Sequence, residues 1–496
     1  VQEFYKVIKS PILNFPEAHI ISNGKYNVVL TNTGSGYSRC DSAAISRWRE
    51  DKIESSFGMF FYIQNINSNM VWSAAYEPCR VLPEEYKAIF SSDKIEYLRV
   101  DGSIDTHTEI VVSPEDNAEI RRISLTNHSD HRRVIEVTSY FEVVMSSQAA
   151  DTAHRAFNNL FVKTEYLQGL DAILAERRNR DADKEPVWLY HSVVVEGDAV
   201  GPVQYETDRM KFIGRNRGYK DPEALDVDHP LSNTTGAVIE SGKTVRISYI
   251  TGIEDGRDKV LERVKKYSDI SNVKRAFELA WTRSQVEGRY LNLTEKKIEV
   301  YQRALSHIVY LSPLRRKIKD LIMNNKKGQS GLWSFGISGD LPIVLVSIKN
   351  SDEIDIVYEA LELHEYLRLK GFKMDLVILN ENKGDYMQSL NNQLKSMIES
   401  SHAGDIKDTS GGVFLRQSEE MGREEKTLLF SVARICFKGD GGSLSKQIQG
   451  RNNQANRNKN IVLGLNSKKD IYEEHREEAK DLVFFNEIGG FNKDGN

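Results

Sequence analysis

The sequence predicts a β-rich, multidomain protein in which a large antiparallel β-sandwich is followed by linker helices and a small α/β domain. Two observations predict this order. Apolar and polar residues alternate in short runs over most of the first 290 residues, and beyond residue 257 apolar residues recur at helical spacing. With 496 residues the chain is long enough for about three domains. We expect the sandwich over residues 1–290, the helical linker over 291–340, the α/β domain over 341–438, and a flexible connector and C-terminal helix over 439–496, leading to a further domain.

The predicted strands are short runs rich in β-branched and aromatic residues, separated by turn formers. Typical runs are KYNVVLTN, GMFFYIQN, RRISLTNHS and VWLYHSVVVEG. In RRVIEVTSYFEVVM, side chains alternate between two sets: Ile135, Val137, Ser139, Phe141 and Val143 against Glu136, Thr138, Tyr140 and Glu142. Because side chains alternate across a sheet, we predict one long strand here with a buried face and a solvent face. Many strands without helical crossovers favour two packed antiparallel sheets.

Helices are predicted after residue 257. The segments DKVLERVKKYSD and NVKRAFELAWTRSQVEGRYLNL favour helix, and Pro313 ends or kinks a third helix whose apolar stripe comprises Tyr301, Ala304, Leu305, Ile308 and Val309. From Leu341 on, the strand-like runs PIVLVSI, MDLVILN and GGVFLR alternate with predicted helices over 353–370, 386–400 and 423–438, which is typical of a small α/β domain. Residues 439–470 are rich in Gly, Asn, Gln and Lys, which predicts a flexible connector, and DIYEEHREEAKD predicts a charged helix.

Composition excludes several classes of function. The formal net charge of −5 provides no broad positive field, so we expect no nucleic-acid partner. The longest apolar runs are far shorter than the roughly 18 residues of a membrane span, so no span is expected. Cys40, Cys79 and Cys436 are too few for a disulfide framework, which favours a cytoplasmic location, either free or as the cytoplasmic part of a larger membrane-associated enzyme. The chain starts with VQEFYKVIKS rather than Met, which favours a fragment of a longer protein.

Several familiar catalytic motifs are missing from the sequence. There is no Walker motif, nucleophile elbow or dinucleotide fingerprint, and the histidines lack metal-ligand spacing, so we expect no cofactor and no metal. Glu136 and Glu142 would lie roughly 20 Å apart along one strand at about 3.3 Å per residue, too far for the carboxylate pair of a glycosidase. The glycine-rich GQSGLWSFGISGD, residues 328–340, could shape a ligand loop, but a packed turn is favoured. His364 shares a helix face with apolar residues and is predicted to be a core histidine.

The candidate binding segment is GSGYSRCDSAAISRWRED, residues 34–51, which we expect to be a loop. Sugars are bound by aromatic faces that stack on the pyranose ring and by planar polar groups that bond adjacent hydroxyls. The segment supplies both kinds of group, which favours a glycan ligand. The alternative, weighed equally, is a surface loop whose charges form ion pairs and whose Trp48 anchors the core. We assign no catalytic residue; the candidate carbohydrate-binding residues are Tyr37, Arg39, Asp41, Arg47, Trp48 and Arg49.

Several long segments resemble glycoside hydrolase family 94, the family of cyclic β-1,2-glucan synthases and β-1,2-oligoglucan phosphorylases. They include SNGKYNVVLTNTGSGYSRCDSAAISRWRED, DGSIDTHTEIVVSPEDNAEIRRISLTNHS, QYETDRMKFIGR and GQSGLWSFGISGDLPIVLV. The resemblance runs from about residue 18 to 437 and again at LVFFNEIGGFNKDG. It implies a β-supersandwich whose Tyr37, Arg39, Asp41, Arg47 and Arg49 lie toward a sugar, whereas Cys40 departs from the Trp that the family pattern has there.

In this family the general acid is an Asp on an (α/α)6 barrel, and the residues after 296 predict too few helices for one. The resemblance therefore implies a carbohydrate-binding or scaffolding module of a β-1,2-glucan-processing enzyme, cut off from the barrel. The parent resembles a glycosyltransferase or glycoside phosphorylase, whereas this chain alone is expected not to be catalytic. Expected partners are β-1,2-glucan or another glucooligosaccharide and the neighbouring domains of the same polypeptide. Two alternatives stay open: an active glycoside phosphorylase or glycosyltransferase on β-1,2-glucan, and a purely structural spacer.

Overall fold

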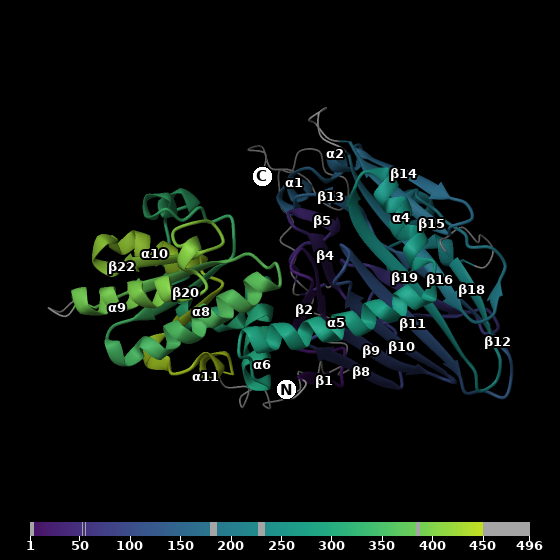
Figure 1. The fold of residues 1–496 in the computed structure, drawn as a ribbon, viewed down its shortest axis with the longest axis horizontal. Helices are drawn as coiled ribbons and strands as arrows, with labels where there is room; N and C mark the ends of the chain where they lie inside the picture. Colours follow the sequence, from purple (N-terminus) through teal and green to yellow (C-terminus); the bar gives the residue numbers. More distant parts are fainter. Residues whose placement is uncertain are drawn as a thin grey trace, which may run out of the picture. The chain divides into compact units, whose positions relative to one another are not determined.

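The structure is a computed structural model, and it describes residues 4–449 apart from 52, 55, 179–185, 227–233 and 383–386. Contacts divide the chain into two units, Val1–Gly450 and Arg451–Asn496. The predicted C-terminal helix and most of the predicted connector therefore lie outside the described residues. Within the first unit, the purple to teal strands form the β-rich part and the green and yellow elements form the α/β part (Figure 1).

Three antiparallel sheets form the β-rich part. The large sheet has nine strands in the order β1 (Tyr5–Ile8), β8 (Glu85–Ser91), β9 (Lys94–Asp101), β10 (Ile104–Val112), β11 (Ala118–Asn127), β19 (Thr244–Asp255), β16 (Val187–Glu196), β15 (Ala172–Arg177) and β14 (Val162–Leu167). The first small sheet has the order β13 (Val143–Ser146), β5 (Ala43–Ser46), β4 (Gly36–Cys40), β3 (Tyr26–Thr31) and β2 (Ala18–Ser22). The second small sheet has the order β17 (Ala199–Val200), β18 (Thr234–Ile239), β12 (Arg133–Tyr140), β6 (Phe60–Asn65) and β7 (Met70–Ser73). The predicted sandwich of antiparallel sheets is confirmed.

Alternation along the strands separates the two faces of the large sheet. On β11, Ile123 and Leu125 face the second small sheet, whereas Ala118 and Ile120 face helices α4 (Arg257–Tyr267) and α5 (Ile270–Tyr290). Because side chains alternate in a strand, the large sheet carries a sheet-to-sheet core on one face and a helix-to-sheet core on the other. Shorter helices, α1 (Gln148–Ala153), α2 (Arg155–Asn159) and α3 (Arg209–Ile213), lie in the connections between strands.

The long strand predicted across RRVIEVTSYFEVVM is wrong. The chain leaves the second small sheet after Tyr140 and enters the first small sheet at Val143, so Phe141 and Glu142 form the crossing between two sheets. The predicted solvent face is also wrong, because Thr138 and Tyr140 are buried. Alternation of apolar and polar residues cannot distinguish one long strand from two consecutive short strands when the alternation continues across the break, since both present the same period.

The α/β part has a parallel four-stranded sheet. Its strands run in the order β22 (Val413–Gln417), β21 (Asp375–Asn380), β20 (Ile343–Ile348) and β23 (Ile435–Lys438), with helices α8 (Ile354–Leu369), α9 (Met387–Ser400) and α10 (Arg423–Val432) between them. A single helix over 423–438 was predicted and is wrong, because α10 ends at Val432 and residues 435–438 form β23. The clue that was missed is the spacing of Ile435 and Phe437: they are two positions apart and both are buried, as expected for a strand.

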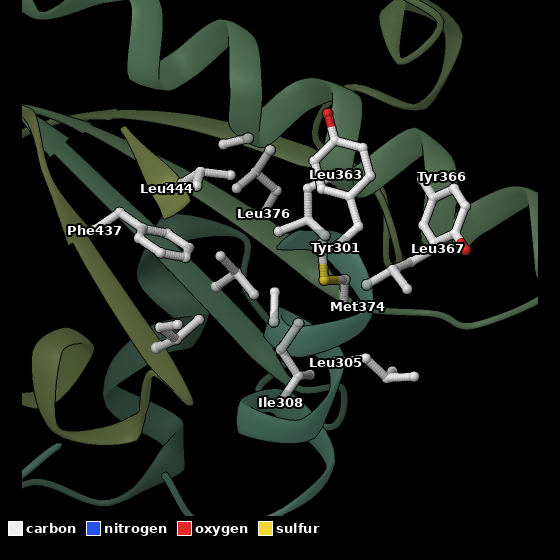
Figure 2. Packing of buried hydrophobic residues seen from close by; sticks show 14 of the residues in the cluster. Tyr301, Leu305, Ile308, Leu363, Tyr366, Leu367, Met374, Leu376, Phe437 and Leu444 are labelled. Carbon is white, nitrogen blue, oxygen red and sulfur yellow. The ribbon is translucent and has the colours of Figure 1, made fainter. Parts of the chain in front are cut away.

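Helix α6 (Glu295–Val309) joins the two parts through one continuous core. Its predicted apolar stripe is confirmed, because all five side chains are buried. The stripe packs against α8, β21 and β23 on one side and against Ile20 and Val29 of the first small sheet on the other. In Figure 2, Tyr301, Leu305 and Ile308 of α6 lie among Leu363, Leu367 and Phe437 of the α/β part.

Two segments near this core differ in how well they were predicted. After Pro313 the chain forms a 3₁₀ turn and then α7 (Lys319–Asn324), and GQSGLWSFGISGD forms a packed turn with Leu332 and Ile337 buried, as favoured. The connector was predicted to begin at residue 439, but α11 (Leu444–Ile448) buries Leu444 and Ile448 against the shared core. Two apolar residues four positions apart were enough to anchor one helical turn.

Candidate functional site

The predicted binding segment forms a β-hairpin rather than a loop. Tyr37 and Arg39 lie on β4, and β4 pairs with β3 on one side and β5 on the other. Asp41 occupies the turn with a φ of 49°, a left-handed conformation that Asp tolerates better than most residues. Asp41 and Arg49 are exposed at different places along the segment. The hairpin therefore divides the six candidate residues into separate groups.

One group is aromatic. The rings of Tyr37 and Trp48 have centroids 5.2 Å apart, and Trp48 meets Tyr310 edge-on at 6.0 Å. The Arg39 guanidinium lies 5.0 Å from the centre of the Tyr37 ring and donates to the Gln148 side chain. Trp48 is half-buried and packs against the core shared with α6. This position fits the predicted alternative in which Trp48 anchors the core.

Arg47 points in another direction and is only 3% exposed. Its Nε and Nη2 atoms donate to the two carboxylate oxygens of Asp151 on α1, both at 2.8 Å. Nη2 also donates to Asn159 Oδ1 at 2.9 Å, and Nη1 donates to Glu142. A bidentate, fully buried pairing of this kind uses nearly every donor of the guanidinium. Arg47 is therefore held by ion pairs inside the protein.

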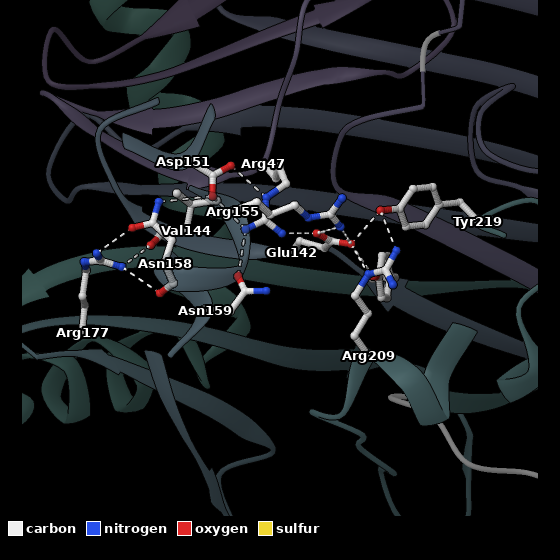
Figure 3. Close-up of polar contacts among 11 residues, drawn as sticks. Arg47, Glu142, Val144, Asp151, Arg155, Asn158, Asn159, Arg177, Arg209 and Tyr219 are labelled. Carbon is white, nitrogen blue, oxygen red and sulfur yellow. Dashed lines mark hydrogen bonds and ion pairs between the residues drawn. The ribbon is translucent and has the colours of Figure 1, made fainter. Parts of the chain in front are cut away.

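Glu142 lies at the centre of a larger polar group, which we call the Glu142 cluster: Arg47, Glu142, Asp151, Arg155, Arg209 and Tyr219. Tyr219 donates to Glu142 Oε1 at 2.6 Å, Arg209 Nε donates to the same oxygen at 2.5 Å, and Arg155 Nη2 donates to Oε2 at 2.8 Å. Figure 3 shows these side chains converging on the carboxylate from separate segments. Three guanidinium groups therefore surround one carboxylate.

The surroundings fix the charge of Glu142. Burial by itself raises the pKa of this carboxyl, but the hydrogen bonds from Tyr219 and Arg209 and the charges of Arg155 and Arg47 together lower it to about 2. Glu142 is consequently ionised at neutral pH. A carboxylate in that state accepts hydrogen bonds and cannot act as a general acid.

Three residues of the Glu142 cluster, Arg47, Glu142 and Arg209, line a cavity of about 270 Å³, which we call the Glu142 cavity. Its apolar wall includes Phe141, Val162, Ile173 and Leu189, and its polar wall includes Glu142, Asn159, His191, Asp208 and Arg209. The volume is close to the lower end of the about 300–1,000 Å³ that small-molecule sites occupy. An apolar wall that faces several convergent polar groups suits a small ligand with many hydroxyls.

His191 on β16 is a neutral member of this wall. Its Nε2 bonds Ser139 Oγ and its Nδ1 bonds Thr251 Oγ1, both at 2.8 Å. Burial lowers the pKa of the His191 imidazole to about 3, and the charge of Arg121 adds to that effect. With His191 neutral and Glu142 ionised, neither group exchanges a proton near neutrality, so these two residues favour binding over acid–base catalysis.

Of the residues in the Glu142 cluster, only Arg47 was a candidate from the sequence. Glu142 was assigned to a solvent face, and Arg155, Arg209 and Tyr219 were not singled out. One clue was present for Arg209, which lies in QYETDRMKFIGR, a segment that carried the family resemblance. Nothing in the local pattern around Glu142 indicated that distant arginines would meet there.

A group of possible metal ligands lies on the large sheet, away from this cavity. Among the described residues, ligand atoms of Glu96, His107 and Glu109 lie within 4.8 Å of one another. Lys94 Nζ is 3.1 Å from Glu96, and Arg122 donates twice to Glu109, at 2.7 and 2.9 Å. Two cations thus already neutralise the carboxylates, which disfavours a metal ion at this position.

Comparison with known proteins identifies relatives of the chain. The family model of the glycosyl hydrolase 94 supersandwich domain matches residues 3–270. The chain is 30% identical over 510 residues to the cyclic beta-(1,2)-glucan synthase NdvB of Rhizobium meliloti (strain 1021), which covers 99% of this chain and 18% of that protein. It is 25% identical over 222 residues to the solabiose phosphorylase of Paenibacillus borealis, which covers 42% of this chain and 27% of that protein.

The chain thus spans less than a third of the length of either curated relative. Among solved structures, a bacterial glucoamylase complexed with acarbose has a TM-score of 0.30 at 10% identity, over 62% of this chain and 44% of that chain. None of the helices in the described ranges has the length and apolarity needed to cross a bilayer.

Proposed function

Because this chain belongs to glycosyl hydrolase family 94 through its supersandwich domain, we propose that it is a non-catalytic, carbohydrate-binding and scaffolding module of a β-1,2-glucan-processing enzyme. Its ligand is β-1,2-glucan or another glucooligosaccharide. Support for the linkage comes from the likeness to a cyclic beta-(1,2)-glucan synthase along nearly the whole chain. Support for binding comes from the cavity that the sandwich itself builds.

The observation that carries the proposal is the Glu142 cavity. The Glu142 carboxylate is occupied by donors from the protein, so the charged group left to bond sugar hydroxyls is Arg209, whose guanidinium has five N–H donors and uses only some of them on Glu142 and Tyr219. The side chain of Arg209, which lines the cavity, is 50% exposed and so reaches a ligand, whereas Arg47 is enclosed. A sugar ring placed there has apolar carbon against the wall and hydroxyls at the cluster.

Absence of catalysis by this chain alone is part of the proposal. The described residues form antiparallel sheets and an α/β sheet, whereas the family resemblance implies that the general acid lies on a helical barrel. All three cysteines are unpaired in the structure, which supports a reducing, cytoplasmic setting. Incubation with β-1,2-glucan and inorganic phosphate is expected to release no sugar 1-phosphate, and release would favour the phosphorylase alternative.

Calorimetric titration with linear β-1,2-glucooligosaccharide tests the binding. We expect Arg209→Ala to weaken binding by about 1 to 3 kcal/mol, because it removes a charged donor next to the ligand. The matched control is Arg217→Ala, an arginine of similar exposure that pairs with Asp226 and does not line the cavity. No heat with the wild-type chain at millimolar ligand would overturn the proposed function.

A further inference from the structure

A second cavity, which we call the Trp281 cavity, lies between one edge of the large sheet and two helices. It has a volume of about 470 Å³ and is lined by residues of β1, β8 and β9 on one side and of α5 and α6 on the other. Figure 1 shows α5 running beside β8 and β9. This volume falls within the about 300–1,000 Å³ of small-molecule sites. None of the residues that line it belongs to the Glu142 cavity.

Two large aromatic side chains lie at this cavity with much of their surface open to solvent. Trp281 of α5 is 48% exposed and Tyr5 of β1 is 67% exposed, while Phe4 and Ile298 beside them are buried. Aromatic rings that stay exposed next to a hollow provide flat apolar faces for a ligand. A pyranose ring presents a matching flat face of C–H groups.

Gly288 forms part of the helical wall of the cavity. It lies in the last turn of α5, but it does not end the helix, because Asn292 adopts the left-handed conformation there with a φ of 49°. Nothing lies within 4 Å of the position a Cβ would take at Gly288, so close packing does not require glycine either. Glycine is unfavourable in a helix, and here its effect is to leave the cavity wall without a side chain.

The polar residues of the cavity indicate a neutral ligand with hydroxyl groups. Carboxylates come from Asp93 and Glu295 and an amide from Gln285, whereas the Glu96 carboxylate is already paired with Lys94 and His107. Lys94, also in the wall, is already engaged at 3.1 Å by Glu96 and at 3.5 Å by Glu109. This acidic lining repels phosphate and other anions, whereas carboxylates and an amide accept hydrogen bonds from hydroxyls.

We propose that the Trp281 cavity is a second carbohydrate subsite, in which a neutral glucose unit of the glucan stacks on Trp281 and Tyr5 and bonds to the acidic wall. This inference rests on the proposed function, because it names a second place where the same glucan binds. Two separate subsites on one rigid sandwich hold one long glucan at two points. Two-point binding raises the affinity for long chains over that for short ones.

The test uses the whole chain and linear β-1,2-glucooligosaccharides, with tryptophan fluorescence and calorimetry as readouts. We expect Trp281→Ala and Tyr5→Ala each to lower the affinity about tenfold and to leave the melting temperature unchanged, with Trp281→Ala also removing the fluorescence change. The matched controls are Trp333→Ala and Tyr358→Ala, exposed aromatics of the α/β part that line neither cavity.

A variant that fills the Trp281 cavity tests the subsite without removing an aromatic side chain. Gly288→Leu is expected to abolish binding at this subsite while keeping or raising the melting temperature, because it adds a better helix former in open space. Thr282→Leu, on an exposed face of the same helix, is the control and is expected to bind normally.

Three outcomes are decisive. Wild-type binding that survives Trp281→Ala and Gly288→Leu but falls with Arg209→Ala overturns the second subsite and leaves the proposed function standing. No binding by the wild type overturns both. A change in self-association of Trp281→Ala by ultracentrifugation, with glucan affinity unaltered, identifies the cavity as a protein contact and also overturns the proposal.

Discussion

Arg47 is 3% exposed and donates to both Asp151 and Glu142, so among the six candidate residues it is a structural ion-pair partner. We expect Arg47→Ala to lower the free energy of unfolding by about 3 to 5 kcal/mol, because it leaves buried carboxylate charge unpaired. Arg49→Ala, at an exposed position of the same segment, is expected to change it by no more than about 0.5 kcal/mol. Urea denaturation measures both variants, and equal effects would show that the ion pairs contribute nothing.

Buried histidines give the protein a stability that depends on pH. Burial lowers the pKa of His19 and His191 to about 3 and that of His307 to about 4, whereas in the unfolded chain each protonates near 6.5. As the pH falls below about 6.5, the unfolded chain therefore binds protons that the folded chain does not, and stability is lost. Each histidine contributes about 1.4 kcal/mol per pH unit in that window.

Glu77 acts in the opposite sense. Burial raises its pKa to about 7, against the opposing effect of Arg80, so between about pH 4.5 and 7 the folded chain binds this proton more tightly. Denaturation at pH 5 to 7 is expected to show net loss of stability on acidification, a shallower loss for His191→Gln and a steeper loss for Glu77→Gln. Stability that rises on acidification of the wild type would contradict the histidine assignment.

Among the elements, β2 is the edge strand of the first small sheet and is covered by a helix. Ala18 N–H donates to Ser306 Oγ at 2.8 Å and Ile20 N–H donates to Gln302 Oε1 at 3.1 Å, both from α6. Side chains thus satisfy backbone groups that an uncovered edge would leave open to pairing with another chain. The amphipathic pattern of α6 predicted which face is apolar, but it did not predict that polar residues beside that face would bond a strand edge.

We expect Ser306→Ala to cost about 1 to 3 kcal/mol, because the buried Ala18 N–H loses its acceptor. Hydrogen exchange followed by mass spectrometry should show faster exchange at residues 18–20 and little change elsewhere in the first small sheet. Thr282→Ala is the control, since its hydroxyl bonds only within α5. Unchanged exchange at Ala18 would show that the Ser306 contact does not protect the edge.

For the whole molecule, the β-rich part and the α/β part are joined by more than their shared core. Arg434 makes a bidentate ion pair with Glu50 at 2.6 and 2.9 Å, and the buried Lys370 bonds Glu287 of α5 at 2.6 Å. α6 has apolar partners on both sides, so separating the parts would expose its stripe. The two parts are therefore expected to unfold together.

Limited proteolysis with mass spectrometry tests this expectation. We expect one protected fragment that contains both the sandwich and the α/β part, with the two surviving or disappearing together over time. Gln302→Ala is expected to weaken the junction between the two parts, because it removes the acceptor of the Ile20 N–H, so the fragment should be lost earlier. Early cleavage between residues 290 and 340 in the wild type, with separate stable halves, would contradict a shared core.

The order of the parts and the period of most strands and helices were determined by the sequence alone, because apolar periodicity is a local property that neighbouring residues carry. The stripe on α6 and the alternation on β11 are of this kind. Family membership was also readable in the sequence, through long segments rather than single residues. The prediction of a single helix over 423–438 was wrong for a local reason. The ten residues of α10 have a clear helical pattern, and the strand β23 that follows has only four residues.

Only the tertiary structure decided where individual polar side chains meet. Arg47 reaches Glu142 and Asp151 across 95 and 104 positions of sequence, and Arg209 reaches the same carboxylate across 67. Composition showed that residues 34–51 hold arginines and aromatics, but it could not show that Arg47 turns inward while Trp48 packs on α6. The physical reason is that a charge becomes buried only where distant segments supply its partners, and those partners come together only when the sheets pack.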